Sequence, residues 1–78
     1  MIFYESSQIL ASWKTNDVVL QKCCIDENEH YWRILSIENF HNPFAQSTCN
    51  ADSFEEVSLW ADLHSLNVVT VLDRTKTN

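Results

Sequence analysis

The sequence predicts one small α+β domain, in which a single main helix packs on one face of a mostly antiparallel sheet of three or four strands. Two observations predict this class. Between residues 9 and 38, β-branched and aromatic runs alternate with short polar turn signals. After residue 52, a helix start signal opens an apolar segment, and a short β-branched run follows it. With 78 residues, 45% of them hydrophobic, the chain suffices for one core, so residues 1–78 are treated as one domain.

The first half of the chain is expected to form a three-stranded meander, preceded by a short strand fragment. The strands are placed at residues 9–15, 18–25 and 30–38, and the fragment at residues 2–4. Asn16 and Asp17 supply a tight hairpin turn, because both residue types tolerate positive φ in a chain without glycine. The acidic residues 26–29 supply a second, longer turn. An alternative interpretation makes residues 7–13 a short helix rather than a strand.

The length of the second turn fixes the register of the meander and so decides which residues share a face. With a four-residue turn, Leu20 is expected opposite Leu35, on a core face that also holds Trp13. Lys22 then lies opposite Arg33, an unfavourable pairing of like charges. The other face would carry the apolar residues Val19, Trp32 and Ile34. One helix cannot cover both faces, so part of this apolar surface is expected to contact a partner.

The main helix is expected to run from Phe54 to Leu66. Ser53 followed three residues later by Glu56 forms a capping box, which satisfies backbone N–H groups at the start of a helix. Asn67 suits the left-handed conformation that often follows a helix. Residues 68–72 are rich in β-branched side chains and are expected to form a short buried strand.

The apolar residues of this helix cover about twice the arc that a helix needs to lie on one sheet. One group consists of Phe54, Val57, Trp60 and Ala61, and the other of Leu59, Leu63 and Leu66. Two explanations compete. Either the long loop at residues 39–51 and the apolar N-terminus fold over the second group, or the three leucines dock onto another chain.

Charge is unevenly distributed along the chain. The net charge is −6, and no Lys or Arg lies between Ile34 and Asp73. Direct nucleic-acid binding is therefore disfavoured, because phosphate contacts need a basic surface. An acidic surface suits a basic protein partner, and Asp52, Glu55 and Asp62 are expected to form a strip along the helix that engages it. The alternative is that these carboxylates form a solvated face that keeps the protein soluble.

The residue content argues against catalysis and against a bound cofactor. Without glycine, the chain has no phosphate-binding loop, dinucleotide fingerprint or nucleophile elbow. The three histidines and three cysteines lack the close spacing of a zinc site. Cys23, Cys24 and Cys49 are interpreted as reduced thiols, and a bridge from Cys49 to one of the adjacent pair is left open. No segment has the pattern of a membrane span or a signal peptide, so a cytoplasmic location is expected.

In size, acidity and lack of catalytic motifs, the chain resembles, as a class only, the inhibitors that phages and mobile elements make against host nucleic-acid-binding machinery. That class includes anti-CRISPR proteins and DNA mimics, and no motif here matches any one member. The hypothesis is an acidic protein-binding module, not an enzyme, that occupies a basic site on a partner protein. The expected contact residues are Asp52, Glu55, Asp62, Leu59, Leu63, Trp32 and Ile34. The alternative is a homodimeric structural or regulatory module that pairs through an apolar sheet face.

Overall fold

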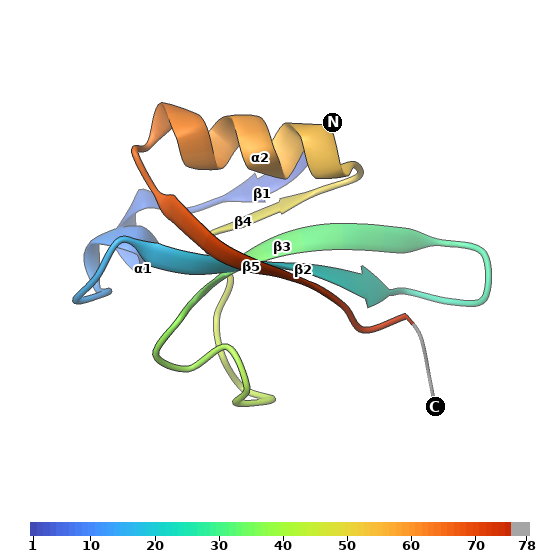
Figure 1. The fold of residues 1–78 in the computed structure, drawn as a ribbon. Coiled ribbons are helices and arrows are strands. Elements are labelled where there is room, and N and C mark those ends of the chain that lie inside the picture. The colour runs from blue at the N-terminus through green and yellow to red at the C-terminus, as the bar shows by residue number, and fades with distance from the viewer. Residues whose placement is uncertain (76–78) are drawn as a thin grey trace.

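In the computed structural model, which describes residues 1–75, the strands form one five-stranded mixed sheet and helix α2 crosses one face of it (Figure 1). In chain order the elements are β1 (Ile2–Glu5), α1 (Ser7–Ala11), β2 (Asp17–Cys24), β3 (His30–Ser36), β4 (Cys49–Ala51), α2 (Phe54–Leu63) and β5 (Asn67–Asp73). Across the sheet the strand order is β1-β4-β3-β2-β5. The α+β class and the one main helix agree with the prediction, but the sheet is larger than the three or four strands expected.

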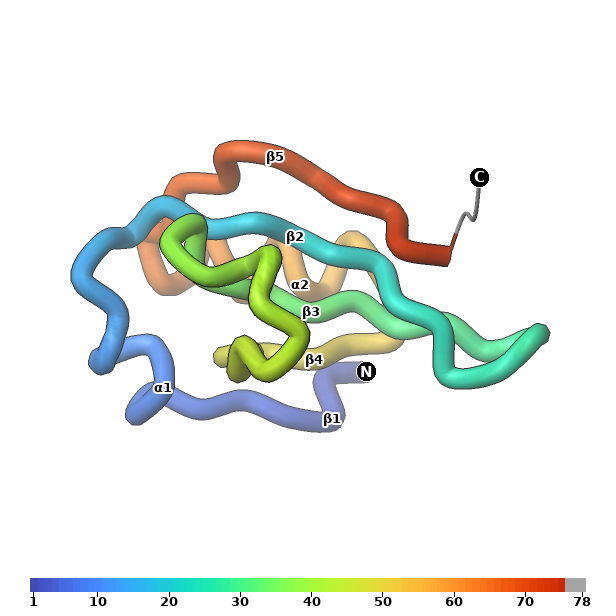
Figure 2. The backbone as a smooth tube through the Cα atoms, turned by 90° about the horizontal axis from the view of Figure 1, so that it is seen from below, coloured from blue at the N-terminus to red at the C-terminus, as the bar shows by residue number. Residues whose placement is uncertain are grey.

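The sheet is mixed because β5 runs parallel to β2, whereas the other neighbouring strands are antiparallel. It follows that β4 and β5 point in the same direction, and strands with this relation need a crossover connection. Helix α2 supplies the crossover, because it passes over β3 and β2 on the way from β4 to β5 (Figure 2).

Strand β4 is the element that the sequence does not predict. Its residues Cys49, Asn50 and Ala51 have little intrinsic strand propensity, and the sequence places them in a loop. In the structure they pair on both sides, with β1 and with β3. Pairing between segments far apart in the chain therefore determines the conformation of β4.

The predicted strand at residues 9–15 is wrong, and the alternative of a short helix describes this segment. Helix α1 begins after Ser6, whose side-chain oxygen accepts a hydrogen bond from the Ile9 N–H at 3.2 Å. The predicted hairpin turn at Asn16 and Asp17 is consequently absent. Instead, the Asn16 carbonyl accepts a hydrogen bond from the Asn67 N–H at 2.8 Å, which joins the start of β2 to the start of β5.

The pairing of β2 with β3 is shifted by one residue from the predicted register. Leu20 lies opposite Ile34, and Leu35 lies opposite Val19. Since a shift of one residue moves a side chain to the other face of a sheet, Leu20 and Leu35 are buried on different faces rather than on the same one.

The turn between β2 and β3 explains the shift. The Ile25 N–H donates a hydrogen bond to the Glu29 carbonyl at 2.8 Å, and this closes a turn of five residues, 25–29, instead of four. The predicted like-charged pair of Lys22 and Arg33 does not form, because each residue faces an uncharged residue of the other strand. The observed register is thus the better one electrostatically.

The two faces of the sheet are covered by different segments. Helix α2 packs on a core formed by Val18, Leu20, Ile34, Cys49, Ala51, Val57, Trp60, Ala61 and Leu66. The segment at residues 37–48 lies on the opposite side of the sheet, where Val19 and Leu35 are buried (Figures 1 and 2). The expectation that this segment folds over a flank of the helix is therefore wrong, because it covers the sheet instead.

Helix α2 ends earlier than predicted, at Leu63. Ser65, rather than Asn67, adopts the left-handed conformation, with φ 57°. The Leu66 N–H then donates a hydrogen bond to the Ala61 carbonyl at 2.9 Å, and the Leu66 side chain turns into the core. In the part of the chain that the structure describes, no helix has the length and apolar character needed to cross a membrane.

Candidate functional site

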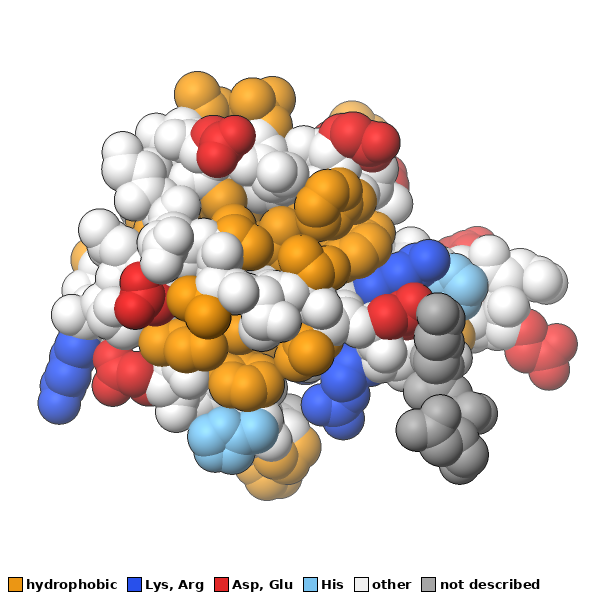
Figure 3. All heavy atoms as spheres, in the orientation of Figure 1, with side chains coloured by type: hydrophobic (Ala, Val, Ile, Leu, Met, Phe, Trp, Pro, Cys, Tyr) orange, Lys and Arg blue, Asp and Glu red, His pale blue; other side chains and the backbone are white. Residues whose placement is uncertain are grey.

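The side of α2 that points away from the sheet combines two exposed leucines with two carboxylates. Leu59 and Leu63 are 59% and 72% exposed, and Glu55 and Asp62 are exposed near them. Residues four apart lie one turn apart on the same side of a helix, so the two leucines form one apolar patch. Figure 3 shows hydrophobic and acidic side chains next to one another along the helix. We call these four residues the outer face of α2.

Contacts on the inner side of α2 hold this outer face in place. The Ser53 hydroxyl accepts a hydrogen bond from the Glu56 N–H at 3.3 Å and caps the helix. The Trp60 indole N–H donates to the Glu5 carboxylate of β1 at 2.8 Å, and the Trp60 ring stacks on His64 with centroids 3.9 Å apart. These contacts and the buried core beneath them fix the helix relative to the sheet.

Two of the predicted contact residues lie on the face of the sheet that α2 covers. Ile34 is fully buried in the core, and Trp32 is partly buried with its ring 5.1 Å from that of Phe54. Leu66, predicted on the apolar flank, is also buried. The prediction of Ile34 as a surface residue is wrong because the register shift moves it to the face that α2 covers.

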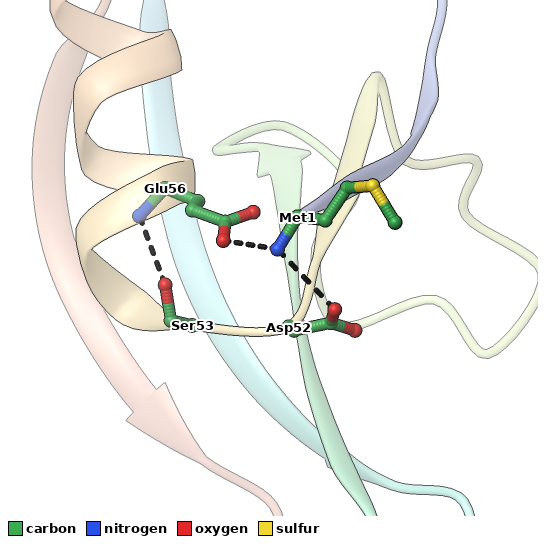
Figure 4. A network of polar contacts seen from close by, with 4 residues as sticks. All are labelled: Met1, Asp52, Ser53 and Glu56. Atoms are coloured by element: carbon green, nitrogen blue, oxygen red, sulfur yellow. Dashed lines mark hydrogen bonds and ion pairs between the residues drawn. The ribbon is translucent and has the colours of Figure 1, made fainter.

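Asp52 lies at the start of α2 and is paired within the chain. The Met1 α-amino nitrogen is 3.3 Å from an Asp52 carboxylate oxygen and also contacts the Glu56 carboxylate (Figure 4). Hydrogen bonds to Glu56 and to Asp52 raise the pKa of the α-amino group above its usual value. Glu55 and Asp62, by contrast, make no ion pair with any residue in the range 1–75. The acidic strip is thus reduced to these two carboxylates, about 10 Å apart along the helix axis.

A second exposed apolar surface follows β5 at the edge of the sheet. Val69 and Val71 are 52% and 48% exposed. Figure 3 shows hydrophobic side chains gathered on this side of the molecule below the helix. The prediction of a buried strand here is wrong because, among the described residues, β5 pairs with β2 alone and lies at the edge of the sheet. The sequence does not reveal this edge, since residues 68–72 contain neither the charged residue nor the proline that often marks an edge strand.

Cys23, Cys24 and Cys49 are all free thiols. Cys49 is fully buried, and its pKa is raised to about 11, first by burial and then by the negative charges of Glu5 and Glu56. A thiol with so high a pKa stays protonated at neutral pH and is a poor nucleophile. Among the described residues, no three His, Cys, Asp or Glu side chains are grouped as metal ligands.

Comparison with known proteins finds no matching family model, no matching curated protein and no matching solved structure. The function of this chain must therefore be inferred from its own surfaces.

Proposed function

We propose that this protein is a small, non-catalytic protein-binding module, and that the outer face of α2 docks on a partner protein. The exposed pair Leu59 and Leu63 is the observation that carries this proposal, because it lies on a helix whose inner side is already fixed in the core. Neither leucine belongs to the hydrophobic core, and more than half of each is exposed. A partner that removes it from water gains the free energy of burying apolar surface.

The charge of the molecule indicates the kind of partner. Glu55 and Asp62 are exposed near the leucines, and the net charge of the chain is −6. Such a surface attracts a basic partner over a distance and repels acidic ones. The proposed partner is therefore a protein that presents an apolar depression bordered by Lys or Arg. Direct binding to nucleic acid is disfavoured by the same charge.

By analogy, an acidic module of this kind acts as an inhibitor or mimic that occupies a nucleic-acid-binding site on another protein. Anti-CRISPR proteins and DNA mimics of phages and mobile elements act in this way, and the analogy rests on size, charge and missing catalytic motifs. The proposed location is the cytoplasm, where free thiols such as those of this chain stay reduced.

A quantitative capture experiment tests the proposal. Immobilised wild-type protein is compared at low and moderate salt with the double variants Leu59→Ser/Leu63→Ser and Glu55→Gln/Asp62→Asn, and the captured protein is then purified and its binding measured directly. The leucine variant is expected to lose binding at both salt concentrations. The amide variant is expected to lose binding mainly at low salt, because salt already screens exposed charges at the higher concentration.

Ile25→Ser is the matched control for this experiment. It removes an apolar side chain that is 60% exposed, as Leu59 is, but that lies in the turn between β2 and β3. It should bind the partner as wild type does. If both double variants are folded and bind as well as wild type, the outer face of α2 is not the docking surface.

A homodimer is the second candidate, and the exposed edge of β5 is the observation that favours it. Antiparallel pairing of two β5 strands would satisfy the unpaired backbone groups of each edge and bury Val69 and Val71. The apolar sheet face predicted from the sequence does not exist as one surface, because α2 covers Trp32 and Ile34 whereas Val19 is buried on the opposite side of the sheet. Light scattering over a concentration series should show a dimer that Val69→Lys abolishes, whereas a monomer at every concentration would exclude this candidate.

A further inference from the structure

We draw no further inference here: the strongest candidate, the hollow of about 190 Å³ beside the C-terminal end of α2 that Glu5, Ser7, Trp60 and His64 line, carries none, because its one carboxylate is exposed and already accepts the Trp60 indole N–H at 2.8 Å, and no other group in its lining specifies a ligand.

Discussion

The two faces of the sheet differ in what covers them and in what they bury. Under α2, the central strands contribute the apolar residues Val18, Leu20 and Ile34 to the core. On the opposite face, Val19 and Leu35 are buried beside a polar row that includes Gln21, Arg33 and Asn50. The face under the helix is built as a core, whereas the opposite face combines packing with unsatisfied polar groups.

The covering segments explain the difference. A helix satisfies its own backbone and so brings mainly side chains to a sheet. The irregular segment at residues 37–48 brings backbone groups that need partners of their own. Polar side chains meet part of this need, since the Ser36 hydroxyl accepts from the Glu38 N–H at 3.2 Å and the Asn42 side-chain oxygen accepts from the Phe44 N–H at 2.9 Å. Polar groups are therefore part of the construction of this face.

The largest effects on stability are expected for Leu20→Ala and Leu35→Ala. Each substitution shortens one buried leucine, and the two leucines lie on opposite faces of the sheet. Each change should lower the free energy of unfolding by roughly 2–5 kcal/mol, through lost transfer energy and a cavity. Leu20→Ala should lie at the upper end, because α2 and the sheet cannot close around the gap. Leu35→Ala should cost less, because an irregular segment can settle over a smaller side chain. Urea unfolding measures both values, and a larger loss for Leu35→Ala would contradict this comparison.

The second prediction concerns the polar row. Gln21→Leu places an apolar side chain at a fully buried position, which on the α2 face would be favourable. Here it should lower the free energy of unfolding by about 1–3 kcal/mol, because the Arg33 Nε–H loses its acceptor. Val19→Leu, a change on the same strand and face that leaves Arg33 untouched, tests for simple overpacking. Stabilisation by Gln21→Leu would show that Arg33 does not depend on this bond.

The sequence predicts best where the signal is local. The capping box places the start of α2 at Phe54, as observed, because Ser53 and Glu56 interact within one turn. The wide apolar arc of the helix, by contrast, leaves open whether the loop covers the second group of apolar residues, and only the structure shows that Leu59 and Leu63 are exposed and Leu66 is buried. The cap could be predicted because its information lies within a few neighbouring residues.

The sequence fails where structure depends on distant pairing. Strand β4 forms because β1 and β3 flank it, and its own residues give no strand signal. The turn between β2 and β3 is one residue longer than predicted, so Leu35 and Ile34 each lie on the face opposite to the predicted one. The polar composition of the turn does not reveal its length. The polar row of Gln21, Arg33 and Asn50 could not be predicted for the same reason, since these residues lie side by side only in the observed register.

The third prediction compares a buried and an exposed thiol. The pKa of Cys49 is raised from 9.0 to about 11 by burial, and then by the charges of Glu5 and Glu56. Below pH 9.0 the thiol is protonated in both states, so its contribution to stability is fully present. Between the two values the unfolded chain loses the proton first, so the free energy of unfolding falls as pH rises, by on the order of 1 kcal/mol. Denaturant melts across this range should show a shallower fall for Cys49→Ala than for wild type, whereas Cys24→Ser should keep the wild-type slope.

The smallest expected effect on stability comes from the outer face of α2, and it separates a structural from a binding role for its two carboxylates. Glu55 lies in the first turn, where the helix dipole favours negative charge, so Glu55→Lys should cost about 0.3–1 kcal/mol. Asp62 lies in the last turn, where the dipole disfavours negative charge, so Asp62→Lys should raise the free energy of unfolding by a similar amount. Asp62 thus occupies a position that is unfavourable for the fold, which is understandable if its charge serves a partner. Thermal melts of the two single variants, with capture measured on the same samples, should show opposite shifts in stability but the same loss of low-salt binding. If Asp62→Lys destabilises the protein as Glu55→Lys does, Asp62 has a role within the chain and the docking surface would reduce to the two leucines.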